Sequence, residues 1–447
     1  MGKDTLTVTD NRTGKTYEIP ILYGTSPNMI GMISTADLKQ IKSSEDDFGV
    51  VSFDPGLTNT ATCRSAITFI DGEKGILRYR GYPIDQLAEQ SSFLEVAYLL
   101  LQGELPDQRQ YDLWVGQITE SSIIHESIKK YLEGFNYDAH SMGMLVGALG
   151  ALSTFYPDAR EVQCQRGFPG QPPICDVTTM QVHIWRIIGK LPTIAAFGHR
   201  HSRGLPYVYP MEGLSYVSNL LHMLSGMPDV DPEVDPVLAR ALDTLFILHA
   251  DHDQCCSTTT MRCIASAHAD PYSAVAGAAA ALYGPLHGGA NEEVLKMLAE
   301  IGSEERVPAY LERVKALEAP LPGFGHRLYS APDPRVPLIK EAADRVFEAT
   351  KRNPMMDIAL KIEEVTSQDE FFVSRGLCPN TEFYSGVVYQ AMGLPLDTMS
   401  VLFAIPRAAG WLANWKELLV DEEQRIYRPR QVYTGVEHRD FVPIAER

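Results

Sequence analysis

The chain has 447 residues, enough for two or three domains of average size and for a large hydrophobic core. Apolar residues make up 45% and charged residues 21%, as is typical of a soluble globular protein. The formal net charge of -18 argues against a protein that binds nucleic acid or a membrane surface, although a local arginine cluster can still bind an anionic substrate.

Targeting signals and cysteine usage indicate the compartment. The first ten residues contain neither the apolar core of a signal peptide nor an Arg/Ser-rich transit pattern, and the last three, Ala445-Glu446-Arg447, are not the peroxisomal Ser-Lys-Leu. No apolar run is long enough to cross a bilayer. The seven cysteines include no Cys-x-x-Cys pair, which favours reduced thiols. We therefore expect a cytoplasmic location and no membrane partner.

Strand signals are confined to the first part of the chain. Residues 4–22 alternate between polar and apolar types around a turn at Asp10–Gly14, which predicts a small β-hairpin. Residues 66–70 read as a short strand between two glycine-containing turns.

Helical periodicity dominates from residue 92 onward. Ser92 and Glu95 form a capping-box pattern ahead of a helix that runs to Leu101 and stops at Gly103. The segment 142–155 is apolar nearly all round, so it is either deep core or a subunit interface. Residues 157–178 read as an irregular surface loop. Further helices are predicted at 180–190, 213–226, 233–249, 273–283, 292–301, 304–317, 335–351, 354–366, 368–375 and 400–419.

The stretch Gly284-Pro285-Leu286-His287-Gly288-Gly289-Ala290-Asn291 places a histidine between two predicted helices. The second helix begins with Glu292 and Glu293, whose charges suit the positive end of a helix dipole. Because that end disfavours imidazolium, we expect His287 to be neutral and to donate a hydrogen bond. For a lone histidine, packing or capping in the turn is the alternative.

Four more stretches combine histidine, arginine or a carboxylate with glycine or proline. They are residues 247–254, with His249 and His252; residues 322–335, with His326 and Arg335; residues 379–386, with Glu382; and residues 428–435, with Arg430. Together with the His287 stretch, they resemble the citrate synthase family in order and approximate spacing, and the similarity runs from about Phe53 to Thr434.

The residue types themselves point to acid–base chemistry. The chain has no P-loop, no dinucleotide fingerprint and no Gly-x-Ser-x-Gly elbow, and His249-x-x-His252 lacks a third metal ligand, so no metal is expected. The set suits carbon–carbon bond formation, in which a carboxylate removes a proton beside a carbonyl and neutral histidines donate to the oxygens of both reactants. Arginines would hold a polyanionic acceptor through bidentate contacts.

The resemblance implies a mainly α fold with a small N-terminal β-hairpin region. It implies a large domain over 1–288, a small lid domain over 289–397, and a return to the large domain over 398–447 with an arm that reaches the partner subunit. It also implies a homodimer or a higher assembly of dimers, and it favours the interface role for 142–155.

The resemblance further implies condensation of acetyl-CoA with oxaloacetate and water to citrate and CoA, with no cofactor beyond CoA as a substrate group. It assigns the thioester oxygen to His287, the ketone of oxaloacetate to His326 and the base to Glu382. The other matched residues, His252, Arg335, Arg407 and Arg430, would contact oxaloacetate or citrate, with Arg430 coming from the partner subunit. His249 is either a substrate contact or a buried structural residue of its helix.

Glu382 departs from the family pattern, which has aspartate there. The glutamate arm is longer by one carbon–carbon bond, about 1.5 Å, and a misplacement of about 1 Å can cost on the order of a hundredfold in rate. A catalytically weak paralogue is therefore one alternative. The other is 2-methylcitrate synthase, which uses propionyl-CoA, because one methylene discriminates by only about 1–3 kcal/mol.

Overall fold

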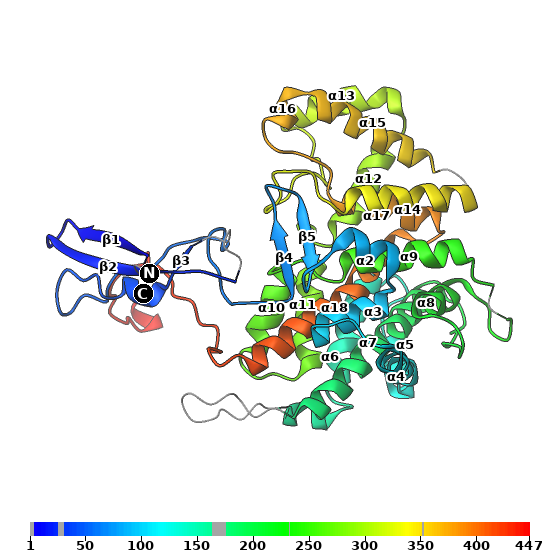
Figure 1. The fold of residues 1–447 in the computed structure, drawn as a ribbon, viewed down its shortest axis with the longest axis horizontal. Coiled ribbons are helices and arrows are strands. Elements are labelled where there is room, and N and C mark those ends of the chain that lie inside the picture. Colours follow the sequence, from blue (N-terminus) through cyan, green and yellow to red (C-terminus); the bar gives the residue numbers. More distant parts are fainter. Residues whose placement is uncertain (1–3, 26–30, 163–175, 232, 351–352) are drawn as a thin grey trace. The chain divides into compact units, whose positions relative to one another are not determined.

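The computed structural model describes residues 4–25, 31–162, 176–231, 233–350 and 353–447, and these are mainly helical (Figure 1), which confirms the predicted fold class. The chain forms two compact units, Met1–Ala66 and Ile67–Arg447. No helix in the described ranges is long and apolar enough to span a membrane. Residue 351 and most of the predicted loop at 157–178 lie outside the described residues.

The first unit is built on the predicted hairpin. Strand β1 (Thr5–Asp10) pairs antiparallel with β2 (Lys15–Leu22), and β2 also pairs with the short β3 (Met32–Ile33). The connecting turn closes because the N–H of Gly14, at φ 70°, donates to the Asp10 carbonyl at 2.7 Å. A single helical turn, α1 (Thr35–Leu38), follows. The hairpin prediction is confirmed.

The second unit begins with an antiparallel sheet in the order β4-β5-β6. The strand predicted at 66–70 is β4 (Thr68–Asp71), and it pairs with β5 (Ile76–Tyr79), which in turn pairs with β6 (Tyr82–Pro83).

Helices make up the rest of the second unit. In chain order they are α2 (Ile84–Gln90), α3 (Phe93–Gln102), α4 (Gln108–Glu120), α5 (Glu126–Glu133), α6 (Ser141–Leu152), η1 (Pro157–Glu161), α7 (Val177–Ser202), α8 (Tyr216–Ser225), α9 (Pro236–His249), α10 (Cys256–Ala265), α11 (Pro271–Leu282), α12 (Ala290–Ile301), η2 (Glu304–Arg306), α13 (Val307–Lys315), α14 (Val336–Ala349), α15 (Pro354–Gln368), α16 (Glu370–Val373), α17 (Thr381–Ala391), η3 (Leu396–Thr398), α18 (Met399–Val420) and η4 (Ile444–Glu446). The predictions missed α1, α2, α4, α5, α10 and α17.

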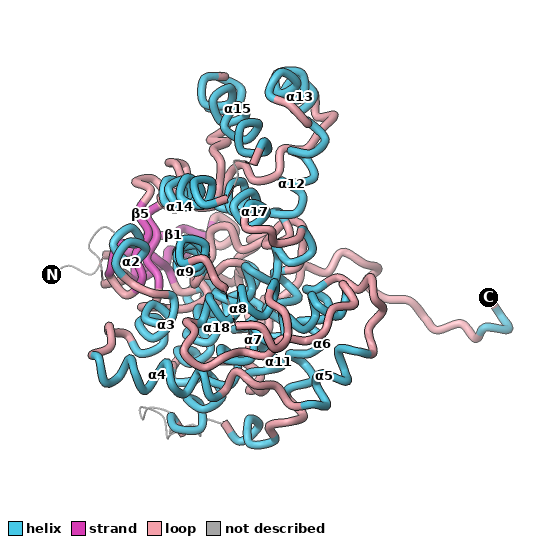
Figure 2. The backbone as a smooth tube through the Cα atoms, turned by 90° about the vertical axis from the view of Figure 1, so that its right-hand side faces the viewer, coloured by secondary structure: helices cyan, strands magenta, loops and turns pink. Residues whose placement is uncertain are grey.

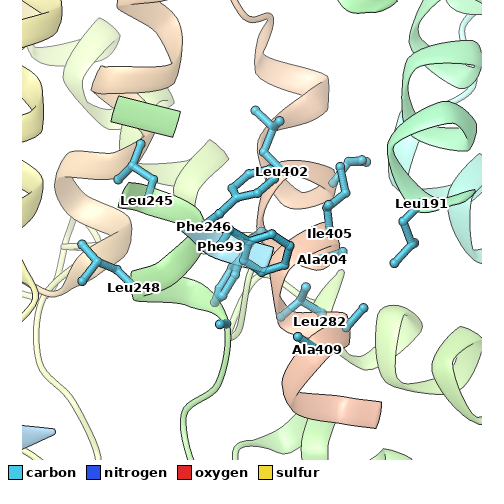
Figure 3. Packing of buried hydrophobic residues seen from close by; sticks show 14 of the residues in the cluster. Phe93, Leu191, Leu245, Phe246, Leu248, Leu282, Leu402, Ala404, Ile405 and Ala409 are labelled. Carbon is cyan, nitrogen blue, oxygen red and sulfur yellow. The ribbon is translucent and has the colours of Figure 1, made fainter. Parts of the chain in front are cut away.

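Helix α18 is the central element of the core. It packs on α3, α7, α9, α10 and α11, and Figure 2 shows it beside α3, α7 and α11. Its residues are buried from Met399 through Trp415. Figure 3 shows Leu402 and Ile405 of α18 in the same cluster as Phe93 of α3 and Phe246 of α9. The rings of Phe93 and Phe246 meet edge to face at 5.5 Å.

The start of α3 matches its predicted cap in part. The Ser92 hydroxyl accepts the N–H of Glu95, and Gly103 ends the helix at φ 97°. The Glu95 carboxylate does not return to the Ser92 backbone; it accepts a hydrogen bond of 2.6 Å from the Ser91 hydroxyl instead. The Ser91 hydroxyl therefore gives Glu95 the hydrogen bond that, in a capping box, comes from the backbone N–H of the N-cap residue.

Helix α7 is longer than predicted, because it continues through Pro192 to Ser202. A proline inside a helix removes the hydrogen bond to the carbonyl four residues earlier, here that of Ile188. The Tyr216 hydroxyl donates to this carbonyl at 2.9 Å. The predicted end at residue 190 is therefore wrong: a side chain from α8 compensates for the missing bond.

Helices α12 to α17 lie close together at one end of the second unit in both views (Figures 1 and 2). Helix α12 packs on α15 and α17, α13 packs on α15, and α14 packs on α17 and on α9. The domain boundaries at 288 and 397 stay predictions.

Candidate active site

His287 lies in the turn between α11 and α12, as predicted. Its backbone N–H donates to the Gly284 carbonyl at 2.9 Å, and its ring atom Nε2 lies 2.8 Å from the Ser257 hydroxyl at the start of α10. The Trp411 indole N–H donates to that hydroxyl at 3.1 Å, so the Ser257 proton is directed to Nε2. In this arrangement the neutral His287 ring carries its own proton on Nδ1.

His252 and His326 lie side by side, although 74 positions separate them in the sequence. Their ring centroids are 5.0 Å apart, and Tyr329 contacts both rings. The Tyr329 hydroxyl lies 3.3 Å from His252 Nε2. Burial, followed by the charge of Arg335, holds the pKa of His252 well below its usual range. His252 is therefore a neutral ring at physiological pH.

His326 is held in one tautomer by the backbone. Its Nδ1 accepts the N–H of Leu328 at 3.1 Å and of Tyr329 at 3.3 Å, so the proton of the neutral ring is on Nε2. Burial and the Arg335 charge lower the pKa of His326 to about 4. His326 is thus a neutral hydrogen-bond donor at pH 7.

His249 is completely buried at the end of α9. Its Nδ1 donates to the Leu245 carbonyl of the same helix at 2.7 Å, and burial lowers its pKa to about 3. Its ring packs edge-on against Phe403 at 4.6 Å. These contacts match the structural alternative for His249, while the described part of the chain offers its buried Nε2 no hydrogen-bond partner.

Arg335 is buried beside the two-histidine pair. Its Nε and Nη2 donate to the two oxygens of Asp333 at 2.9 and 2.6 Å, a bidentate ion pair with both side chains buried. Burial lowers the pKa of Arg335, but the Asp333 charge raises it more, so it stays protonated. Two of its donors are therefore already used by Asp333.

Arg407 is buried in α18, one residue after Pro406. Its Nε donates to the His249 carbonyl at 2.7 Å, and Nη1 lies 3.2 Å from the Cys255 sulfur. One turn further on, Gly410 allows a close approach, because a Cβ there would lie 2.3 Å from Asp251 Oδ1. Asp251 accepts a 2.5 Å hydrogen bond from Thr68, and burial raises its pKa to about 7.

Glu382 lies in the first turn of α17. The Asn380 side chain caps this helix by accepting the N–H of Glu382 at 3.1 Å, and it also donates to the Gly325 carbonyl at 3.1 Å. Thr381 donates to the Glu382 carboxylate at 3.0 Å and so restrains its rotamer. The charge of Glu382 also contributes, after the larger effect of Asp333, to raising the pKa of Arg335.

Arg430 lies in the exposed segment that follows α18. Its predicted place in the partner subunit's site stays a prediction.

Sequence reasoning missed three residues that contact the predicted histidines and Arg407. Ser257 holds His287, Tyr329 contacts His252 and His326, and Cys255 contacts Arg407. All three lie within five positions of a predicted histidine in the sequence, which is the only signal that marks them.

Comparisons with known proteins identify the family. A family model described as "Citrate synthase, C-terminal domain" matches residues 56–430. A citrate synthase of Dictyostelium discoideum is 51% identical over all of this chain and 85% of its own length. A peroxisomal citrate synthase of the same organism is 49% identical over 88% of its length, and a glyoxysomal one of Cucurbita maxima is 46% identical over 84%.

Solved structures agree with these relatives. The chain matches the citrate synthase of Pyrobaculum aerophilum with a TM-score of 0.79 and 34% identity, covering 88% of this chain and 95% of that one. It matches the ternary complex of the Thermoplasma acidophilum enzyme with carboxymethyl coenzyme A and oxaloacetate with a TM-score of 0.79 and 30% identity, over 89% of this chain and 100% of that one.

The expected cytoplasmic location is contradicted by two of these relatives, which match the whole chain and are named peroxisomal and glyoxysomal. That expectation depended on the absence of a recognised signal, and such an absence does not exclude import into an organelle.

Proposed function

Because the chain belongs to the citrate synthase family and is an acyltransferase, we propose that it condenses acetyl-CoA with oxaloacetate and water to give citrate and CoA. The observation that carries this proposal is the pair of histidines held at opposite ring nitrogens, His287 at Nε2 by Ser257 and His326 at Nδ1 by backbone N–H groups, which directs Nδ1 of His287 and Nε2 of His326 to serve as donors. Two donors of this kind suit two carbonyl oxygens that gain negative charge in the same reaction.

In the proposed mechanism, Glu382 removes a proton from the acetyl methyl group while His287 donates to the thioester oxygen. The enol carbon then attacks the ketone of oxaloacetate, whose oxygen receives a hydrogen bond from His326. Water hydrolyses the resulting thioester and releases CoA. His252 and Arg407 would hold the acceptor, together with the N–H donors of Arg335 that Asp333 does not use. No cofactor beyond the CoA thioester is included in this mechanism.

Glu382 serves as the base in this proposal despite its longer side chain. The hydrogen bond from Thr381 and the Asn380 cap support it, because both restrain where the carboxylate can lie. A restrained glutamate can deliver its carboxylate to one position, as the shorter residue does.

The working form is proposed to be a homodimer or a higher assembly of dimers. Helix α6 supports this: Gly143 and Gly150 are two turns apart, and within the described ranges a Cβ at either would meet nothing within 4 Å. Gly147 between them is covered by Tyr131 and Phe135, but the open positions on either side of it let a second helix approach closely. The segment that carries Arg430 is exposed, which suits contact with a partner subunit. We also propose a peroxisomal location, based on the two named relatives.

A steady-state assay of CoA release tests the activity and its rival. Acetyl-CoA and propionyl-CoA are each supplied with and without oxaloacetate. We expect release only with oxaloacetate and a higher kcat/KM for acetyl-CoA. A preference for propionyl-CoA would indicate 2-methylcitrate synthase, and no release with either thioester would indicate a catalytically silent paralogue.

A further inference from the structure

Cys255 has no role in the proposed mechanism, yet its sulfur lies inside the site. It precedes α10 at the N-cap position without capping the helix through its side chain. Its Sγ lies 3.2 Å from Arg407 Nη1, 3.3 Å from the Ser257 hydroxyl and 3.2 Å from the Thr258 hydroxyl. The side chain is half-buried, whereas that of the next residue, Cys256, is exposed.

Arg407 is the group that the sulfur faces. Its side chain is 1% exposed, yet within the described ranges it forms no ion pair with a carboxylate, in contrast to Arg335 with Asp333. Its Nε is used by the His249 carbonyl and its Nη1 by Cys255, and the described residues provide no partner for Nη2. A buried guanidinium with an unused donor is suited to bind an anionic ligand.

The charges around the sulfur favour its ionised form. Burial raises the pKa of the Cys255 thiol, but the Arg407 guanidinium and the His287 side chain lower it more, so the pKa is well below its usual range. The titratable groups that interact with it are Arg407 from α18, His287 from the α11–α12 turn, the carboxyl groups of Asp251 and Asp253, and the neutral ring of His326.

We propose that Cys255 is a positioning residue, which occupies Arg407 as a resident anion until the dicarboxylate acceptor binds and thereby sets the affinity for that acceptor. This inference rests on the proposed function, because it takes oxaloacetate as the ligand of Arg407. A carboxylate at Arg407 would lie close to the thiolate and be repelled by it. Acceptor binding therefore drives protonation of Cys255, from S⁻ and H⁺ to SH, and no other bond changes.

Substitutions that remove or strengthen the negative charge at this position test the inference. Cys255→Ser keeps a small polar side chain without the anion, so the KM for oxaloacetate should fall, on the order of tenfold for one pKa unit of relieved repulsion. Cys255→Asp keeps an anion that is harder to protonate and should raise that KM by a similar factor. In both variants kcat at saturating oxaloacetate should stay within about twofold, because the sulfur does not touch the reacting atoms.

Cys256→Ser is the matched control, since it removes the adjacent exposed thiol, and its KM should equal that of the wild type. A Cys255→Ser variant with an unchanged or higher KM would overturn the inference, whether or not the Asp variant folds. A second readout is independent of turnover: the ultraviolet absorbance of the thiolate, taken as wild type minus Cys255→Ser, should disappear as oxaloacetate is added.

Persistence of that absorbance at saturating oxaloacetate would also overturn the inference.

The proposed function and the role of Cys255 would fail in different ways. Wild-type protein that releases no CoA contradicts the proposed function, whereas wild-type protein that turns over normally but shows no KM change in Cys255→Ser contradicts only the role of Cys255.

Discussion

At the residue scale, the two reactive histidines are fixed by different parts of the chain. Backbone N–H groups occupy Nδ1 of His326, while a serine hydroxyl oriented by Trp411 occupies Nε2 of His287. The other nitrogen of each ring carries the proton, so neither ring has to lose a proton before it can donate. The site can therefore stabilise developing charge on two different oxygens without rearranging its own hydrogen bonds.

Glu382 provides a prediction about whether the site is adapted to its longer side chain. If the site is adapted to the longer side chain, Glu382→Asp should lower kcat on the order of a hundredfold, because the carboxylate falls short by about 1.5 Å. Glu382→Gln should be severely defective, since an amide cannot accept the proton. Single-turnover rates of CoA release separate these cases. A Glu382→Asp enzyme faster than the wild type would show that the natural site is impaired instead.

Asp251 provides a prediction about pH. Burial raises its pKa to about 7 from an ordinary 3.8, so the folded protein holds its proton more tightly than the unfolded chain does. Stability should therefore fall as pH rises from about 4 to about 7, by up to roughly 4 kcal/mol at 1.36 kcal/mol per pKa unit. Urea unfolding at several pH values should show this slope in the wild type and a flatter one in Asp251→Asn. Equal slopes in the two proteins would contradict a raised pKa of Asp251.

The sequence identified the histidines, and it could not identify what holds them. His287 and His326 were recognisable because they lie in motifs that are continuous in the chain. Ser257 reaches His287 only because α10 and the α11–α12 turn pack together, and 30 positions separate the two residues. Such contacts depend on tertiary placement, which no local pattern encodes.

At the element scale, segments with a strong periodic pattern were predictable from the sequence. The full length of α7 and the presence of α17 were not. The hairpin, α6, α9, α12 and α18 follow directly from alternation or helical spacing. Helix α7 continues through Pro192 because a hydroxyl 24 positions later satisfies the carbonyl that the proline leaves open. Helix α17 begins at a polar, glycine-containing motif that hides its periodicity.

The α7–α8 contact gives a stability prediction. Tyr216→Phe leaves the Ile188 carbonyl without its donor, which should lower the free energy of unfolding by about 1–3 kcal/mol. Tyr209→Phe is the matched control, because that hydroxyl bonds Glu126 at an exposed site and should cost less than about 0.5 kcal/mol. Urea denaturation measures both. Equal losses of unfolding free energy in the two variants would show that the helix around Pro192 does not depend on the hydrogen bond from Tyr216.

At the scale of the whole molecule, the site residues come from two groups of helices. His326, Arg335 and Glu382 belong to the predicted lid, whereas His252, His287 and Arg407 belong to or adjoin the predicted large domain. A dianion that contacts both groups would favour a closed arrangement, and closure would exclude water from the enolate.

Small-angle scattering tests this closure. Saturating oxaloacetate should reduce the radius of gyration, and Arg407→Gln should lose the response, since the ligand would no longer contact the large domain. The same scattering curve from wild-type protein with and without oxaloacetate would rule the closure out.

The central claim is that this site joins acetyl-CoA to oxaloacetate using His287 and His326. The most direct measurement is mass spectrometry of the product formed from ¹³C-acetyl-CoA and oxaloacetate by the wild type and by His287→Ala and His326→Ala, each shown to be folded by circular dichroism. We expect labelled citrate from the wild type and a loss of at least about a hundredfold in its rate of formation in each variant. Labelled citrate formed at the wild-type rate by either folded variant, or none formed by the wild type, would contradict the claim.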